Sequence, residues 1–388
     1  MLKKYFWILF IVLFSLAALT AEKINSRLYM SDYKVYHRTA KRIVNKENIY
    51  SVKQDGHYVF KYSTTSGIYF IPISFIPLKY AKYIYWLALT IMLCIGVNVL
   101  YKLIDNKYKI GANKNSIIIL SIIAVIAHIF RELHLGQVNM LLLVMYITLI
   151  YFLQQKSKIL FALMLSISVF LKPFGLIFFP YLLIKKEYKI ILTSLIFIFI
   201  LALLPLLFYP NWHDFSNLYF DWINELKVEL NKKQALLADG NHTVFSVFAR
   251  YTPLKFIIVN QIIEKVYQAL VLIIIGAGLF IEFRKKNHNS DIVYQMILLI
   301  SIIPLLAFTT YNLFIFELPI ILYLIYFFKD LNITQKIMVV IGCILIGGNI
   351  HEITGSALRD YLIGISVYTF GTISLITALI LFKNAKLD

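Results

Sequence analysis

Residues 131–139 carry the densest set of reactive side chains in an otherwise apolar part of the chain. The segment reads Arg-Glu-Leu-His-Leu-Gly-Gln-Val-Asn and is predicted to form a short outer turn between two membrane spans. Five polar side chains in nine positions exceed what a tight turn needs. The Arg131 guanidinium suits bidentate binding of phosphate, and His134 can add a second donor. An anion site is one interpretation. A turn in which Arg131 pairs with Glu132 and reaches towards the interface is the other.

Asp32 lies just beyond the first apolar run, where a carboxylate can act as a general base on an acceptor hydroxyl. Ser31-Asp32 also has the pattern of a helix N-cap, which requires no chemistry. The helix that follows is amphipathic and is predicted to lie in the membrane interface. Its apolar face comprises Val35, Tyr36, Thr39, Ala40, Ile43 and Val44, and its basic face Lys34, Arg38, Lys41, Arg42 and Lys46.

Two further cations are predicted on the same side of the membrane. Lys172 precedes a proline between the short apolar runs 159–171 and 174–184, which favours a re-entrant or tight outer hairpin. A lysine at that depth needs an anionic partner, either a lipid phosphate or an internal carboxylate. Arg250 follows Asn-His-Thr at 241–243. The sequence leaves open whether Arg131, Lys172 and Arg250 converge on one phosphate site.

Several kinds of site have no support in the sequence. It contains no phosphate-binding glycine loop, dinucleotide fingerprint or zinc spacing, so no cofactor and no metal are predicted. His128 is interpreted as a buried core histidine. Glu317 lies inside an apolar run and could mark a proton pathway. A polytopic transporter or flippase of lipid-linked glycans is therefore the alternative function, and a non-catalytic envelope scaffold is a second.

The composition requires a membrane. The 388 residues are 60% hydrophobic and 15% charged, whereas soluble domains carry roughly 25% charged residues. Apolar runs such as 190–208 and 292–308 approach the ~20 residues that cross a bilayer. The fold class predicted is an all-α polytopic membrane protein, one transmembrane domain over residues 1–388 with about 12 transmembrane helices. The net charge of +18 is scattered between these runs, which favours anionic lipid as the partner and not nucleic acid.

The distribution of lysine and arginine sets the predicted topology. With both termini cytoplasmic, the basic clusters fall on inner loops, as the positive-inside rule requires. Two long loops, 22–67 and 209–260, then face outwards. The second is predicted to contain another amphipathic helix over 215–230, with Trp212 and Trp222 as interfacial anchors. Long loops usually carry function, so any chemistry is expected on the extracytoplasmic side.

Several segments, in order, resemble one family. They are SDYKVYHRTAKRI with NIY behind it, FKY before FIPISFIPLKYAKYIYW, RELHLGQVNMLLL, SISVFLKPFGLIFFPYLLIKKEYK and NHTVFSVFARY. Over roughly residues 1–330 the chain resembles glycosyltransferase family 87, a GT-C group that includes polyprenyl-phosphate-mannose-dependent mannosyltransferases. The Gly-Gln-x-Asn turn followed by the Lys-Pro hairpin is the most specific part.

The resemblance implies a GT-C-like bundle that transfers a mannose-like hexose or a pentose from a polyprenyl-phosphate donor to a lipid or glycan acceptor. The reaction would occur outside the cytoplasm, at a bacterial inner membrane, with Asp32 matching the family's catalytic base. Residues expected at the donor phosphate are Arg131, His134, Lys172 and Arg250. Residues expected at the sugar or acceptor are Tyr36, Glu132, Gln137, Asn139, Asn241, His242, Asn312 and His351. The chain departs from the family at Tyr311-Asn312, where many relatives carry histidine.

Overall fold

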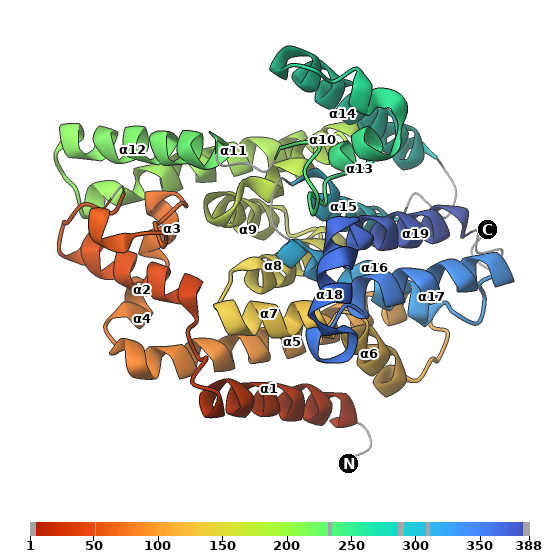
Figure 1. Ribbon diagram of the computed structural model, residues 1–388. Helices are drawn as coiled ribbons and strands as arrows, with labels where there is room; N and C mark the ends of the chain where they lie inside the picture. Colours follow the sequence, from red (N-terminus) through yellow and green to blue (C-terminus); the bar gives the residue numbers. More distant parts are fainter. Residues whose placement is uncertain (1–4, 51, 232–234, 286–290, 308–310, 383–388) are drawn as a thin grey trace. The chain divides into compact units, whose positions relative to one another are not determined.

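The computed structural model describes residues 5–50, 52–231, 235–285, 291–307 and 311–382, without the side chains of 229–231 and 351–352. The described residues form helices and turns and no strand (Figure 1). The helices, with 3-10 segments marked η, are α1 (Phe6–Ile24), α2 (Ser31–Val44), η2 (Lys53–Asp55), α3 (Thr64–Ile68), α4 (Ile71–Ser74), α5 (Leu78–Tyr108), α6 (Lys114–Ile123), α7 (Ile126–Leu135), α8 (Asn139–Gln154), α9 (Lys158–Leu171), η3 (Pro173–Ile177), α10 (Phe178–Ile184), α11 (Tyr188–Leu203), η4 (Leu204–Leu207), α12 (Trp212–Asn231), α13 (Val244–Tyr251), η5 (Pro253–Phe256), α14 (Gln261–Arg284), α15 (Ile292–Leu306), η7 (Tyr311–Glu317), α16 (Leu318–Tyr326), α17 (Ile333–Gly347), α18 (His351–Gly364) and α19 (Val367–Leu381).

The membrane-capable helices are fewer than predicted. In the described parts of the chain, four stretches are long and apolar enough to cross a bilayer: Phe6–Ile24, Leu78–Tyr108, Tyr188–Leu207 and Gln261–Arg284. Two bent helix pairs, α6 with α7 and α18 with α19, raise the number to six if each pair is one span. Six further apolar helices have 10–17 residues, short of the ~20 needed. The all-helical membrane fold is confirmed, and the count of about twelve spans is not.

The chain divides into two compact units. Unit 1 contains Met1–Phe10, Val97–Ile129 and Gln234–Asp388, and unit 2 contains Ile11–Gly96 and Phe130–Lys233. The first long loop belongs to unit 2. In this unit α2 packs against α3, at the end of the loop, and against α4, which follows it (Figure 1).

The structure corrects two predictions for α2. The helix begins at Ser31, its N-cap is Met30 in a left-handed conformation, and Asp32 lies inside the first turn. Asp32 is therefore not the cap. The apolar face, which includes Tyr36 and Ala40, is buried within unit 2, so it does not face lipid as predicted. Arg42 on the basic face makes two hydrogen bonds to Asp55, at 2.6 and 2.9 Å, which tie the helix to η2.

The second long loop contains the predicted helix, which is α12. The Trp222 indole Nε1 donates to the Lys61 carbonyl at 3.2 Å, so α12 is fastened to the first loop within unit 2. Trp222 therefore joins α12 to the first long loop of the same chain through this hydrogen bond. Trp212 is exposed, and its interfacial role stays a prediction.

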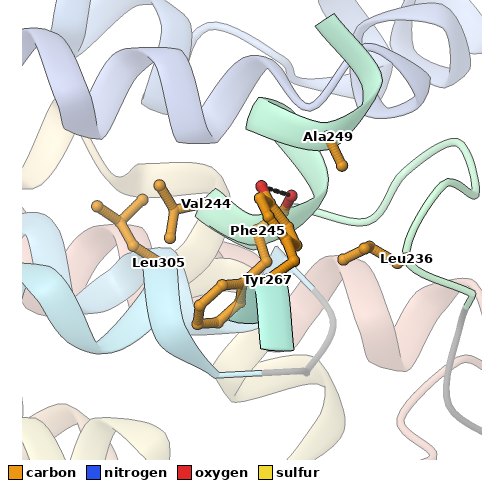
Figure 2. Packing of buried hydrophobic residues seen from close by; sticks show 6 residues of the cluster. All are labelled: Leu236, Val244, Phe245, Ala249, Tyr267 and Leu305. Atoms are coloured by element: carbon orange, nitrogen blue, oxygen red, sulfur yellow. Dashed lines mark hydrogen bonds between the residues drawn. The ribbon is translucent and has the colours of Figure 1, made fainter. Parts of the chain in front are cut away.

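Unit 1 has its own apolar core. Buried residues of α13, α14 and α15 pack together, and the Tyr267 hydroxyl donates to the Phe245 carbonyl at 2.7 Å (Figure 2). Helices α17 and α19 lie side by side (Figure 1). A Cβ on Gly342 would stand 2.7 Å from Leu375 and 3.1 Å from the Gly371 carbonyl. Glycine at these positions therefore permits the close helix packing common in membranes.

Candidate active site

The predicted polar turn is built differently from a tight hairpin. Residues 131–135 form the end of α7, and the chain turns at 136–138 before α8 begins at Asn139. Helix α7 is bent by 65° from α6, so the apolar run that precedes the turn is not one straight span. The polar side chains therefore project from two helix ends in different directions, which a compact loop would not achieve.

Gly136 brings this turn against α2. Its φ is +66°, a conformation that L side chains rarely adopt. A Cβ at this position would stand 2.6 Å from the Tyr33 Cβ and 3.1 Å from the Met30 Cε. Glycine thus permits both the backbone conformation and the close approach of the N-terminus of α2. As a result Gln137 reaches Asp32, and its Nε2 donates to the Asp32 Oδ2.

Burial dominates the electrostatics of Asp32. Desolvation raises the pKa of this carboxyl above its ordinary value of 3.8, and the hydrogen bond from Gln137 only partly offsets the effect. Three cations act in the same offsetting direction: Lys172, Lys61 and Arg131. Asp32 is thus a partly desolvated carboxylate that faces several positive charges. A carboxylate whose pKa lies closer to neutrality is a stronger base, so this environment favours proton acceptance.

Lys172 is held by a buried chain of hydrogen bonds. Its Nζ donates to the Asn139 Oδ1 at 2.7 Å, and the Asn139 Nδ2 donates to the Glu132 Oε1 at 2.7 Å. The other Glu132 oxygen accepts from the Met140 N–H at 3.0 Å. Glu132 is 0% exposed and Asn139 1% exposed. The internal carboxylate that the sequence left as an alternative partner of Lys172 is therefore present, linked through Asn139.

A small cavity lies beside Asp32. It has a volume of about 140 Å³ and is lined by Asp32, Val35, Tyr36, His57, Tyr58, Val59, Lys61, Tyr62 and Gln137. The Tyr36 and Tyr62 hydroxyls share a hydrogen bond of 3.2 Å, and the Lys172 Nζ lies 5.7 Å from the Tyr62 ring centroid. The cavity thus combines a carboxylate, an amide, phenols and nearby cations within unit 2.

Six of the nine residues that line the cavity were not predicted from the sequence as site residues: Val35, His57, Tyr58, Val59, Lys61 and Tyr62. Among them, Lys61 and His57 are exposed residues of the first long loop and look like ordinary solvated side chains in the sequence. The Lys61 carbonyl accepts the bond from Trp222, so the fold of the two loops sets the position of this segment. Because the loop contains many lysines and arginines, its sequence does not distinguish Lys61, the lysine that lines the cavity, from the others.

His134 has a different partner from the one predicted. Its Nδ1 lies 2.6 Å from the Glu22 Oε2, at the end of α1. The pair joins α1 to α7. Arg131 acts on the electrostatics of Asp32. Of the four predicted phosphate ligands, unit 2 thus gathers Arg131 and Lys172 around the carboxylate and directs His134 to Glu22.

The remaining predicted residues belong to unit 1. Arg250 donates to the Gly364 carbonyl at 2.8 Å, to the Asn241 carbonyl at 3.3 Å and to the Asp239 carboxylate at 3.2 Å. Asn241 itself is buried. Arg250 thus joins the loop before α13 to the C-terminal end of α18. A role for Arg250 or Asn241 in substrate binding stays a prediction.

His242 is 2% exposed and packs near the rings of Tyr368 and Phe314, with centroids 5.0 and 5.6 Å away. Burial lowers its pKa to about 3, assisted by the positive charge of Arg250, so the imidazole is neutral. Asn312 is buried in η7. The side chain of His351 lies outside the described residues.

Two isolated predictions concern His128 and Glu317 in unit 1, and the proton pathway at Glu317 stays a prediction. The His128 Nε2 lies 3.1 Å from the Ile346 carbonyl, so the interpretation as a satisfied core histidine is confirmed. Glu317 is fully buried at the end of η7. In the part of the chain that the structure describes, no three histidine, cysteine or acidic side chains gather as metal ligands.

Comparison with known proteins gives one match. No curated protein and no solved structure matches the chain. The family model of glycosyltransferase family 87 matches residues 60–309, a range that contains the Gly-Gln-x-Asn turn, Lys172 and all of α12 to α15. Because that range covers well over half of the chain, this protein belongs to glycosyltransferase family 87.

Proposed function

We propose that this membrane glycosyltransferase transfers a sugar from a polyprenyl-phosphate donor to a lipid or glycan acceptor, with Asp32 as the general base. The sugar would be a mannose-like hexose or a pentose, and the reaction would take place on the extracytoplasmic side of a bacterial inner membrane, with both termini cytoplasmic. Family membership favours a transferase over the transporter and scaffold alternatives.

The observation that carries the proposal is the pairing of a partly desolvated carboxylate with a partly buried ammonium group. Asp32 faces the cavity, and Lys172 is the cation with the largest effect on it. A general base must be ionised yet basic, and a leaving phosphate must find a fixed positive charge. The two groups supply these requirements from α2 and from the end of α9.

The proposed reaction is a single displacement. Asp32 accepts the proton of the acceptor hydroxyl, whose oxygen forms a bond to the anomeric carbon of the donor sugar. The bond from that carbon to the phosphate oxygen breaks, and polyprenyl phosphate leaves with the electron pair. Lys172 and Arg131 stabilise the charge that grows on the phosphate. The attack opposite the leaving group inverts the anomeric configuration.

Donor turnover in proteoliposomes tests the base. Asp32→Asn keeps the shape of the side chain and removes proton acceptance, so we expect turnover to fall by about 10²–10⁴-fold. Glu47→Gln is the matched control, because Glu47 is an exposed carboxylate shortly after the same helix and should have no effect. Wild-type turnover in a folded Asp32→Asn variant would remove Asp32 from the mechanism.

Donor affinity tests the phosphate ligands separately. Arg131→Ala should raise the apparent KM for the polyprenyl-phosphate sugar more than it lowers kcat. An unchanged KM would leave Arg131 without a role at the phosphate. A transporter would instead move the intact lipid-linked sugar across the bilayer without release of polyprenyl phosphate, so product analysis in the same vesicles separates the two functions.

A further inference from the structure

Unit 1 contains a large apolar groove, and none of the proposed site residues lines it. It has a volume of about 1010 Å³ and lies between α6 and α17, with the end of α16 along it. Its walls are formed mainly by isoleucine, valine and leucine side chains of these helices. Two of them, Leu120 and Ile344, are more than half exposed. An exposed apolar hollow of this size on a membrane protein requires an apolar occupant.

The groove is a wedge that closes at one end. A Cβ on Gly347 would stand 2.3 Å from the Ala124 carbonyl oxygen, so the backbones of α6 and α17 meet there. The lining at the opposite end is polar and includes Asn113, Lys329 and Asp330. The occupant must therefore be apolar along most of its length and polar at one end.

The length of the wedge matches one leaflet of a bilayer. Helix α6 has 10 residues and forms the wall from the polar end to the closed end, which at ~1.5 Å per residue gives about 15 Å. The hydrocarbon core of a bilayer is about 30 Å thick, so the wedge is as deep as one lipid chain region. A chain inserted from the polar end would fill it.

The polar end carries positive charge. Lys329 is exposed there, and the Nζ of Lys336 donates to the Lys329 carbonyl at 3.4 Å. Lys336 also lies over the Phe328 ring, 5.9 Å from its centroid. Asp330 also lines this end, so the two lysines and this aspartate leave one net positive charge at the mouth, which complements a lipid phosphate.

No segment outside the described residues is apolar enough to fill the groove. None of the stretches 1–4, 232–234, 286–290, 308–310 and 383–388 contains three consecutive apolar residues. We propose that the wedge between α6 and α17 binds one anionic membrane phospholipid, with its hydrocarbon chain in the groove and its phosphate at Lys329 and Lys336. This site is independent of the proposed donor chemistry, because it lies in unit 1 and needs only a bilayer.

The experiment uses the full chain in nanodiscs of phosphatidylcholine with or without phosphatidylglycerol. Native mass spectrometry after release counts the lipids that stay bound to each chain. Ile344→Trp places a large ring in the groove and should abolish retained phosphatidylglycerol. Ile337→Trp is the matched control, since Ile337 is similarly exposed on the same helix but does not line the groove. Lys329→Gln should weaken phosphatidylglycerol binding about fivefold and leave phosphatidylcholine unaffected.

Cys343 provides a readout that needs no substitution, because it lines the groove whereas Cys94 does not. The rate of its alkylation relative to that of Cys94 should fall when phosphatidylglycerol is added. Equal lipid retention in both tryptophan variants together with an unchanged alkylation ratio would overturn the proposal. A dimer that Ile344→Trp dissolves would also overturn it, in favour of a second copy as the occupant. Loss of lipid binding with normal sugar transfer would leave the proposed function intact.

Discussion

Replacing Gly136 with alanine is expected to disconnect the candidate base from the turn that holds it. Gly136 has a φ of +66°, and its missing Cβ would stand 2.6 Å from the Tyr33 Cβ, where ordinary contact begins near 3.4 Å. The left-handed conformation costs an alanine roughly 1–2 kcal/mol. Overpacking against Tyr33 adds about 1–3 kcal/mol, so the folded state should lose about 2–5 kcal/mol in total.

The effect on activity follows from the direction of the clash. Tyr33 is the neighbour of Asp32 on α2, so relief of the contact moves the carboxylate away from Gln137. A displacement of about 1 Å at a reacting group can cost ~10²-fold in rate. We therefore expect kcat to fall by about this factor, with a smaller change in donor KM, because Lys172 is anchored separately through Asn139.

Gly111→Ala separates backbone strain from the clash. Gly111 has a φ of +70°, and a Cβ added there would meet no atom within 4 Å, so only the conformational cost of roughly 1–2 kcal/mol applies. Thermal unfolding and donor turnover of both variants are compared in the same lipid. If Gly136→Ala is no less stable than Gly111→Ala and turns over donor within a few-fold of the wild-type rate, the close approach at Tyr33 does not position the base.

Three further predictions concern the same charges. Burial raises the pKa of Asp32 in the folded state, so ionisation of this carboxyl opposes folding, and the stability that the protonated form confers is lost as the pH rises above the ordinary pKa of 3.8. Asp32→Asn should therefore unfold at the same or a higher temperature than wild type at pH 7. A clearly lower unfolding temperature of the variant would contradict this. The base must be ionised, so kcat/KM should rise with pH through an apparent pKa above 3.8. A pH–rate series measures this rise, and a flat profile between pH 4 and 7 would refute the prediction. Lys172→Met should raise donor KM by about 10–100-fold, because a charge-assisted hydrogen bond from this partly buried ammonium to the donor phosphate would contribute roughly 1.5–3 kcal/mol. Lys61→Met at an exposed position should change donor KM by less than about fivefold. Equal effects would mean that burial does not distinguish the two cations.

The spacing of polar residues predicted the centre of the site but not the direction of its side chains. Gly-Gln-x-Asn and Lys-Pro were identified as the specific motifs, and both contribute to the cluster around Asp32. Glu132 and Asn139 were expected at a sugar, yet both are buried and support Lys172. A sequence shows that a polar group needs a partner and does not show whether that partner is substrate or protein.

Long-range pairing accounts for the other differences. His134 was expected at a phosphate and instead meets Glu22, which lies 112 positions earlier in the chain. The amphipathic pattern of α2 was correct, but its apolar face meets α3 and α4 and not lipid. An apolar helical face predicts that the face is covered, but the same pattern occurs on helices that contact a bilayer and on helices that pack against a neighbouring helix.

The order Gly136, Gln137, Asn139 has a physical reason. The glycine permits the chain to turn against α2, the next residue then projects towards Asp32, and the residue two positions later starts α8 and faces Lys172 and Glu132. One short turn therefore holds a carboxylate from α2 and an ammonium from the end of α9. Because the two groups come from elements distant in sequence, neither fixes the position of the other without the turn. A longer or more flexible connection would leave two partly buried charges without shared support. The motif is thus explained by the need to hold opposite charges together in a partly desolvated environment.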